Sequence, residues 1–356
     1  MKSIIFSLDY ELYGNGSGNI YTHVIEPTER ILALAELYNV KLTFFVEIVE
    51  FWRIQEEWQK GNTMGYKKNP IEDIKLQLQK AYKQGHDIQL HIHPQWCEAE
   101  YNNGYWKVNL KDWRLGGYNK QGEFSLINLL KNGKATLESW ITPIDKEYKC
   151  IALRAGGYNI QPSKDIVTAM KETGLVIDSS IYPGGKETGI LSNYDYSNID
   201  SDKEWWQTGI ELEKEGKNGI IELPIVAFPI KRWRKFASIE RIKSLLKNSR
   251  SARDSFKAKT NSGSRQKSSM SDKVKYFFQE EWQTWDYCLF SSSLHDLFLK
   301  EVKKQRQRKV FILVGHPKGY MGGSGFRYLL EKTKDEYKYI TINEFYNNEC
   351  AGNKFI

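Results

Sequence analysis

Lys2-Ser-Ile-Ile-Phe-Ser-Leu-Asp9-Tyr-Glu11, close to the start of the chain, is an apolar run that ends in two carboxylates. Successive side chains of a β-strand alternate between its two faces, so a strand here places Asp9 and Glu11 on the same face. Folds that alternate strands and helices carry their reactive groups at the carboxyl ends of parallel strands. The run therefore predicts a buried first strand whose last residues belong to a functional site.

A second apolar run repeats this arrangement with imidazoles. It reads Gly85-His86-Asp87-Ile-Gln-Leu-His91-Ile-His93-Pro94, and the same alternation puts His91 and His93 on one face. Two carboxylates and two imidazoles, with no thiolate among them, suit zinc or a similar divalent metal in a hydrolytic site. From the residues alone, either Asp9 or Glu11 could be the carboxylate that touches the metal.

Short apolar runs alternate with helical patterns along the chain of 356 residues. Helices are expected from about residue 26, over 71–84, and from Ser163 as N-cap to Gly174. The expected strands are 3–9, 41–46, 87–93, 149–154, 175–180, 219–228 and 309–315, with a last short one at 338–342. This alternation predicts parallel strands joined by crossover helices. We therefore expect a single-domain α/β fold, an incomplete seven-stranded (β/α) barrel.

Three stretches interrupt the pattern and are interpreted as loop insertions, at 97–124, 184–217 and 231–290. The last contains most of the positive charge: between Lys231 and Lys275, fifteen lysines and arginines stand against three acidic residues, although the whole chain has a net charge of +8. Such a segment is either a solvated loop or a surface that contacts anions, for example an anionic membrane. Nucleic-acid binding is not expected, because no recognised module accompanies the charge.

Three further expected strands also end in polar groups. Arg154 precedes a Gly-Gly turn, Asp178 precedes two serines, and His316 follows the apolar run that begins at Val310. Five strand ends with charged or titratable groups are what a barrel needs to build a site at one rim.

Taken together, the five motifs resemble those of the polysaccharide deacetylase family, the NodB-homology group of carbohydrate esterases that includes family 4. In order they read Phe-Ser-Leu-Asp9-Tyr-Glu11, Gly-His-Asp-Ile-Gln-Leu-His91-Ile-His93-Pro, Arg154-Ala-Gly-Gly-Tyr, Asp178-Ser-Ser and Leu-Val-Gly-His316-Pro. The resemblance runs from residue 3 to about residue 345, outside the insertions. Two positions depart from the commoner pattern. Tyr10 replaces a second, metal-binding aspartate, so Glu11 takes its place as the carboxylate ligand. Gln95 replaces a metal-binding histidine, so His93 takes its place as the second imidazole ligand.

The resemblance implies a metal-dependent amidohydrolase that removes an N-acyl group, acetyl or formyl, from an amino sugar by attack of metal-bound water. The expected metal is zinc, with the ligands Glu11, His91 and His93. The expected catalytic residues are Asp9 as base, Arg154 as its partner, His316 as acid and Asp178 as the residue that orients His316. A backbone N–H near Gly156 or Gly157 would help to hold the oxyanion.

The expected setting is the cytoplasm, because no leader pattern or membrane-spanning run is evident and the four cysteines show no paired spacing. A phosphate-bearing or lipid-linked sugar, as in surface polysaccharide or glycolipid biosynthesis, would fit peripheral contact at the inner membrane surface through 231–275. Two other functions remain open: an amidase acting on a non-sugar C–N bond, and an inactive carbohydrate-binding homologue. A glycosidase is disfavoured, because two carboxylates of one strand lie too close together to flank a glycosidic bond.

Overall fold

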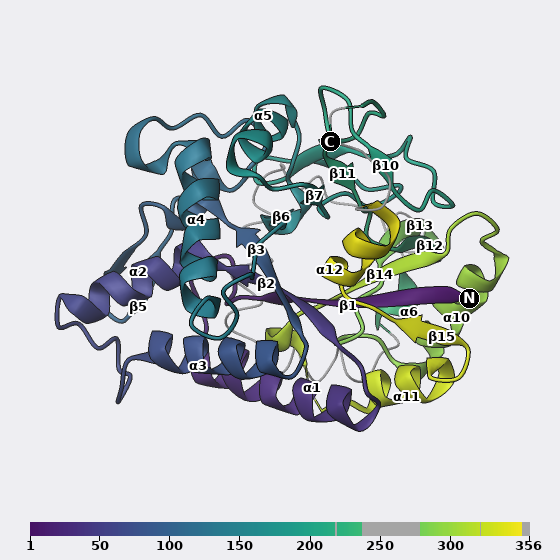
Figure 1. Ribbon diagram of the computed structural model, residues 1–356, viewed down its shortest axis with the longest axis horizontal. Helices are drawn as coiled ribbons and strands as arrows, with labels where there is room; N and C mark the ends of the chain where they lie inside the picture. The colour runs from purple at the N-terminus through teal and green to yellow at the C-terminus, as the bar shows by residue number, and fades with distance from the viewer. Residues whose placement is uncertain (218, 237–277, 321, 351–356) are drawn as a thin grey trace, which may run out of the picture.

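Seven parallel strands form the centre of the protein (Figure 1). The computed structural model describes residues 1–217, 219–236, 278–320 and 322–350. In chain order the seven strands are β1 (Lys2–Tyr10), β2 (Leu42–Glu47), β3 (Asp87–Ile92), β6 (Ala152–Ala155), β7 (Ile177–Asp178), β11 (Ile221–Glu222) and β14 (Val310–Gly315). Their order in the sheet is β11-β7-β6-β3-β2-β1-β14, so each neighbour in space is a neighbour in the chain except at β14. Two more strands extend the sheet: β10 (Trp206–Gln207) pairs antiparallel with β11, and β15 (Tyr337–Tyr339) pairs with the start of β1.

The sheet curls until its two ends meet. Ile225, three residues beyond the end of β11, forms an isolated parallel bridge with Ile312 of β14, and the Val226 N–H donates to the Ile312 carbonyl at 2.8 Å. The seam is a short bridge and not a full ladder of hydrogen bonds. The predicted incomplete (β/α) barrel with seven strands is therefore confirmed.

Helices connect the strands as crossover units and cover the outside of the barrel. They are α1 (Glu26–Leu37), α2 (Ile48–Gln59), α3 (Pro70–Lys83), α4 (Leu126–Ile141), α5 (Lys164–Thr173), α10 (Ser292–Lys304) and α11 (Ser324–Thr333). The short helix α12 (Ile342–Phe345) follows the last strand and packs against the interior of the barrel. Gly174 ends α5 in the left-handed conformation, as predicted, with φ of 70°. Ser163 occupies the N-cap position of α5, but its hydroxyl donates to Glu213 and does not cap the helix. Among the described residues, no helix is both long enough and apolar enough to cross a lipid bilayer.

The buried clusters show which face of each strand points into the barrel. One buried cluster contains Ile5, Phe45, Ala152, Ile177 and Ile312, together with Ile342 and Phe345 of α12. The alternate residues of β1, among them Ile4, Phe6 and Leu8, belong to a second cluster that packs under the helices. Because β1 alternates in this way, Ile5, Ser7, Asp9 and Glu11 all face inward. The apolar interior and α12 fill the rest of the barrel, and the polar groups lie at the carboxyl ends of the strands.

The three stretches that the sequence marks as insertions contain small antiparallel elements. Residues 97–124 hold β4 (Glu100–Asn102) and β5 (Tyr105–Lys107), and residues 184–217 hold β8 (Lys186–Thr188), β9 (Asn193–Asp195) and β10. The third, 231–290, starts at the last residue of β12 (Ala227–Lys231) and includes α6 (Trp233–Phe236) and β13 (Glu280–Thr284), which pairs antiparallel with β12. Residues 237–277, which carry most of the basic segment, lie outside the described residues. The expected contact of the basic segment with a membrane stays a prediction, and so does the single-domain organisation.

Candidate active site

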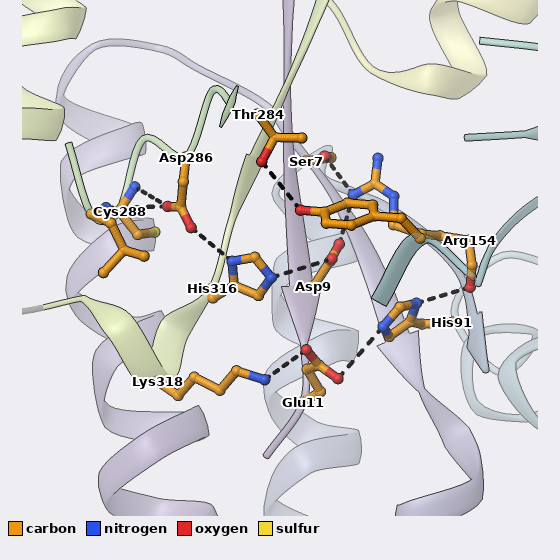
Figure 2. A network of polar contacts seen from close by, with 12 residues as sticks. Ser7, Asp9, Glu11, His91, Arg154, Thr284, Asp286, Cys288, His316 and Lys318 are labelled. Carbon is orange, nitrogen blue, oxygen red and sulfur yellow. Dashed lines mark hydrogen bonds and ion pairs between the residues drawn. The ribbon is translucent and has the colours of Figure 1, made fainter. Parts of the chain in front are cut away.

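The inward faces of β1, β3 and β6 bring together most of the groups that the sequence marks. Figure 2 shows Asp9 and Glu11 from β1 between His91 on one side and His316 on the other, with Arg154 next to Asp9. All five are at least partly shielded; the side chain of His316 is the most accessible, at 21% exposure, against 5% for Asp9 and 1% for His91. The group is therefore most open to solvent at His316.

Glu11, His91 and His93, the metal ligands that the sequence predicts, lie together as a group that could hold a metal ion. One ligand atom of each residue lies within 4.8 Å of those of the other two, and all three residues are buried. Oε2 of Glu11 is 2.7 Å from Nε2 of His93 and 3.5 Å from Nε2 of His91. Among the described residues, these are the only three histidine, cysteine or carboxylate side chains that converge in this way.

The hydrogen bonds of His91 favour metal binding. Its Nδ1 lies 2.9 Å from the Arg154 carbonyl, which can only accept, so Nδ1 carries the proton and Nε2 carries the lone pair. Nε2 of His91 and of His93 are both buried, and neither makes a hydrogen bond of good geometry with the described residues. Two unsatisfied ring nitrogens directed at one carboxylate oxygen fit a divalent cation between them. The residues present therefore suit zinc, although nothing in their geometry selects it over other divalent metals.

His93 is held by its surroundings from three sides. The Gln95 side-chain amide contacts Nδ1 of His93 at 2.8 Å and so holds the ring of this candidate ligand. The Trp113 ring, from the insertion at 97–124, lies 6.2 Å from the imidazole. The backbone of Gly156 covers the remaining side so closely that a Cβ at this position would collide with the imidazole ring. The turn after β6 therefore requires glycine at position 156, because a side chain there would displace the imidazole of His93.

Replacing Gly156 with alanine should displace His93 and weaken metal binding. Gly156 does not have positive φ, so alanine is compatible with the backbone and its methyl group meets the imidazole. We expect zinc affinity, measured by isothermal titration calorimetry, to fall about 10- to 100-fold, as for changes that misorient a ligand. Gly189→Ala is the matched control, because a Cβ there meets only the Ser192 carbonyl at 3.5 Å. Unchanged zinc affinity in Gly156→Ala would show that His93 is not a ligand.

Asp9 is fixed by the contact with Arg154 that the sequence predicts. Nη1 of Arg154 donates to Oδ1 of Asp9 at 2.6 Å and to the Ser7 hydroxyl at 2.8 Å. Nε and Nη2 of Arg154 donate to the carbonyl and hydroxyl of Ser179. Burial alone would raise the pKa of Asp9, but Arg154, followed by the nearby His91 and His316, outweighs burial, so the pKa is lowered. Asp9 is therefore ionised at neutral pH, and its Oδ2 remains available.

His316 lies across from Arg154, with Nε2 at 3.6 Å from Oδ2 of Asp9. Its Nδ1 is 2.8 Å from Oδ2 of Asp286, whose Oδ1 accepts the N–H groups of Cys288 and Leu289 (Figure 2). Burial lowers the pKa of His316, but the hydrogen bond and the negative charge of Asp286 outweigh burial, so the pKa is raised above its ordinary value. Asp286 thus fixes the ring and favours its protonated form.

The prediction that Asp178 orients His316 is wrong. Ile177 faces the barrel interior, so its neighbour Asp178 points to the opposite face of β7, where Leu153 and Glu222 are its register partners. Asp178 accepts hydrogen bonds from the N–H and hydroxyl of Ser180 instead. Strand alternation, applied from Ile177, would have selected Ser179 as the inward residue, and Ser179 is the one that holds Arg154.

Lys318 is a site residue that the sequence analysis missed. Its Nζ donates to Oε1 of Glu11 at 2.6 Å and to the Leu12 carbonyl at 2.7 Å. Burial disfavours the charge of Glu11, but Lys318 and then His93 outweigh it, so the pKa of Glu11 lies well below its ordinary value. Lys318 thereby occupies one oxygen of Glu11 and leaves Oε2 directed at the two histidines. The sequence feature that could have identified Lys318 is its position two residues after His316, beyond the end of β14.

No protein-family model and no curated protein sequence matches this chain. Among solved structures, a Mycobacterium smegmatis protein described as a polysaccharide deacetylase is similar over 97% of this chain and 88% of its own, with 12% identity and a TM-score of 0.47. Puue allantoinase is similar over 98% and 91%, with 12% identity and a TM-score of 0.47. A 4-alpha-glucanotransferase of Thermococcus litoralis is similar over 98% and 40%, with 11% identity and a TM-score of 0.45. Deacetylases, which the motifs resemble, are thus among the similar structures, but likeness at this level does not decide between activities.

Proposed function

We propose that this protein is a metal-dependent hydrolase that removes an N-acyl group, acetyl or formyl, from an amino sugar. The observation that carries the proposal is the arrangement of Asp9. Its carboxylate has one oxygen on Arg154, the other facing His316, and a candidate metal ligand two residues away on the same strand face. A base, an acid and a cation site around one small space are the requirements of amide hydrolysis.

Each group has a definite part in this reaction. A divalent metal at Glu11, His91 and His93 would polarise the acyl carbonyl and acidify a water molecule. Oδ2 of Asp9 would accept the proton of that water, because Arg154 occupies Oδ1. Nε2 of His316 would protonate the departing amine, because Asp286 holds Nδ1. The two atoms that exchange protons with the reactants lie 3.6 Å apart, so the scissile C–N bond would lie between them and the metal ligands.

Aromatic side chains near the site support a sugar as the substrate. Trp113 is half-buried and contacts the turn around Gly14 and Gly157 as well as His93. Tyr13 is also half-buried, and Nζ of Lys318 lies over its ring, 5.5 Å from the ring centroid. Exposed parts of such rings at a site mouth are typical surfaces on which the apolar faces of sugars stack. The proposal includes a phosphate-bearing or lipid-linked sugar, a cytoplasmic location and a role in polysaccharide or glycolipid synthesis.

Release of free amine is the direct test of this function. The zinc-loaded protein would be incubated with N-acetylglucosamine, N-acetylglucosamine oligomers, an N-formyl amino sugar and a non-sugar linear amide, and primary amine would be quantified by a fluorogenic reagent. We expect release from at least one acylated sugar. Release from the non-sugar amide alone would favour the amidase alternative, and release from none would contradict hydrolase activity on these classes.

The pH dependence of activity should change when Asp286 is replaced, but not when Asp178 is replaced. His316 must be protonated to act as the acid, so activity should decline as the pH rises through its raised pKa. Asp286→Asn removes the charge that raises this pKa, so the alkaline limb of the kcat/KM profile should move to lower pH. Asp178→Asn is the comparison, since this carboxylate is directed away from His316. A shift of the limb in Asp178→Asn but not in Asp286→Asn would refute the assignment.

A further inference from the structure

A cavity between α1 and α11 carries positive side chains that the proposed reaction does not use. Its volume is about 270 Å³, and its walls include Arg30 and Leu34 of α1, Tyr320, the Gly322–Gly323 turn and Arg327 of α11. None of the proposed metal ligands or catalytic residues lines it. In Figure 1, α1 and α11 lie next to each other on the outside of the barrel.

The two arginines are not neutralised by the acidic residues of their own helices. Glu26 precedes Arg30 by four residues and Glu331 follows Arg327 by four, which is the spacing of a helical ion pair. Within the described part of the chain, neither arginine forms an ion pair, and Glu331 accepts the Tyr38 hydroxyl at 3.0 Å instead. Both arginines line the cavity, so two positively charged residues without an ion-pair partner among the described residues border one space.

Tyr320 adds a neutral donor that is also without a partner. Its side chain is 5% exposed, and its hydroxyl makes no hydrogen bond to any described residue. The hydroxyl lies directly against Gly323, where a Cβ would collide with it, and Gly323 is part of the cavity wall. Burial raises the pKa of Tyr320 to about 12, against the opposing charges of Arg30 and Arg327, so the phenol is protonated at neutral pH. The hydroxyl is thus a donor beside the cavity wall that no described residue uses.

We propose that this cavity is a phosphate-binding site, with Arg30 and Arg327 as charged donors and the Tyr320 hydroxyl as a third. Guanidinium groups match the geometry of phosphate oxygens and form the stronger, charge-assisted class of hydrogen bond. Gly323 at the N-cap of α11 adds to the fit, since it offers no side chain to the first-turn N–H groups. Phosphate of this kind can come from a free ion, a nucleotide or a lipid headgroup.

The site is connected to the proposed active site by a single short segment. Tyr320 follows His316 by four residues, with the one-turn helix Pro317–Gly319 between them. A phosphate held by Tyr320 would therefore stabilise the loop that carries His316 and Lys318. The inference does not depend on the proposed hydrolase function, because phosphate binding can be measured without metal or sugar.

Calorimetric titration of the full-length protein with inorganic phosphate, without added metal, tests the proposal. We expect one saturable site, and about a tenfold loss of affinity in each of Arg30→Gln and Arg327→Gln, in line with the loss of a charged donor. Tyr320→Phe should weaken binding by a smaller factor, about threefold. Arg306→Gln is the matched control, an exposed arginine outside the cavity, and should bind phosphate like the unmodified chain.

Two further ligands identify the source of the phosphate. Tighter binding of uridine diphosphate than of phosphate would indicate a nucleotide, and sedimentation with phosphatidylglycerol vesicles that is lost in Arg30→Gln and Arg327→Gln would indicate a lipid headgroup. The proposal is overturned if none of the three ligands binds, or if Arg30→Gln and Arg327→Gln bind them as tightly as Arg306→Gln does. Both arginines are exposed, so circular dichroism should show an intact fold in every variant.

Discussion

Asp9→Asn should lower the rate of amide hydrolysis about a thousandfold while the protein still binds its metal. The amide of asparagine cannot accept a proton from water, and general base catalysis typically contributes about 10²- to 10⁴-fold. Asparagine retains the shape of the side chain and an oxygen for Arg154, so the fold should persist. Amine release at saturating substrate gives the rate, and calorimetric titration with zinc gives the affinity.

The metal measurement on this variant distinguishes the roles of the two carboxylates. Glu11 lies against both histidines, whereas Asp9 contacts Arg154 and His316. Zinc should therefore bind Asp9→Asn with nearly unchanged affinity, and Glu11→Gln should bind it much more weakly. The opposite pattern would make Asp9 the ligand and would reverse the assignment.

Alanine at His91 or His93 should abolish activity by removing the metal. Each substitution deletes one of three protein ligands, and even displaced second-sphere residues cost about 10- to 100-fold in affinity, so the loss should exceed 100-fold. Zinc content of the purified variants, by plasma mass spectrometry, should fall from about one ion per chain to near zero.

His23→Ala provides the control for these two substitutions. His23 is a half-buried histidine that belongs to no metal-ligand group among the described residues. Its replacement should leave the zinc content unchanged. If His91→Ala and His93→Ala retained zinc at the level of His23→Ala, the ion would be bound elsewhere and the proposed centre would be wrong.

The strands of the barrel were predictable because each is an apolar run between recognisable helix ends. Buried parallel strands are apolar on both faces, and Ile4 to Tyr10 of β1 are almost fully buried. The same reasoning placed Asp9, Glu11, His91 and Arg154 together, since strand alternation and the common rim of the barrel are local and topological properties. Such properties can be predicted without knowing how the loops pack.

Asp286 could not be predicted in the same way. It follows β13 near the end of the insertion at 231–290, and no apolar run leads into it. Its position beside His316 depends on the backbone pairing of Asp286 with Val314, a contact between segments that only the folded chain brings together. Lys318 could not be predicted for a related reason: its contact with Glu11 joins residues 307 positions apart in the chain.

Anomalous diffraction at the zinc edge, from crystals of the zinc-loaded protein, tests the central claim most directly. We predict one peak per chain, about 2.0–2.2 Å from a Glu11 oxygen and from Nε2 of both His91 and His93. Asp9 and His316 should lie near this peak without binding the ion. The absence of a peak between these three side chains, or a peak on a different set of residues, would contradict a metal-dependent site at this end of the barrel.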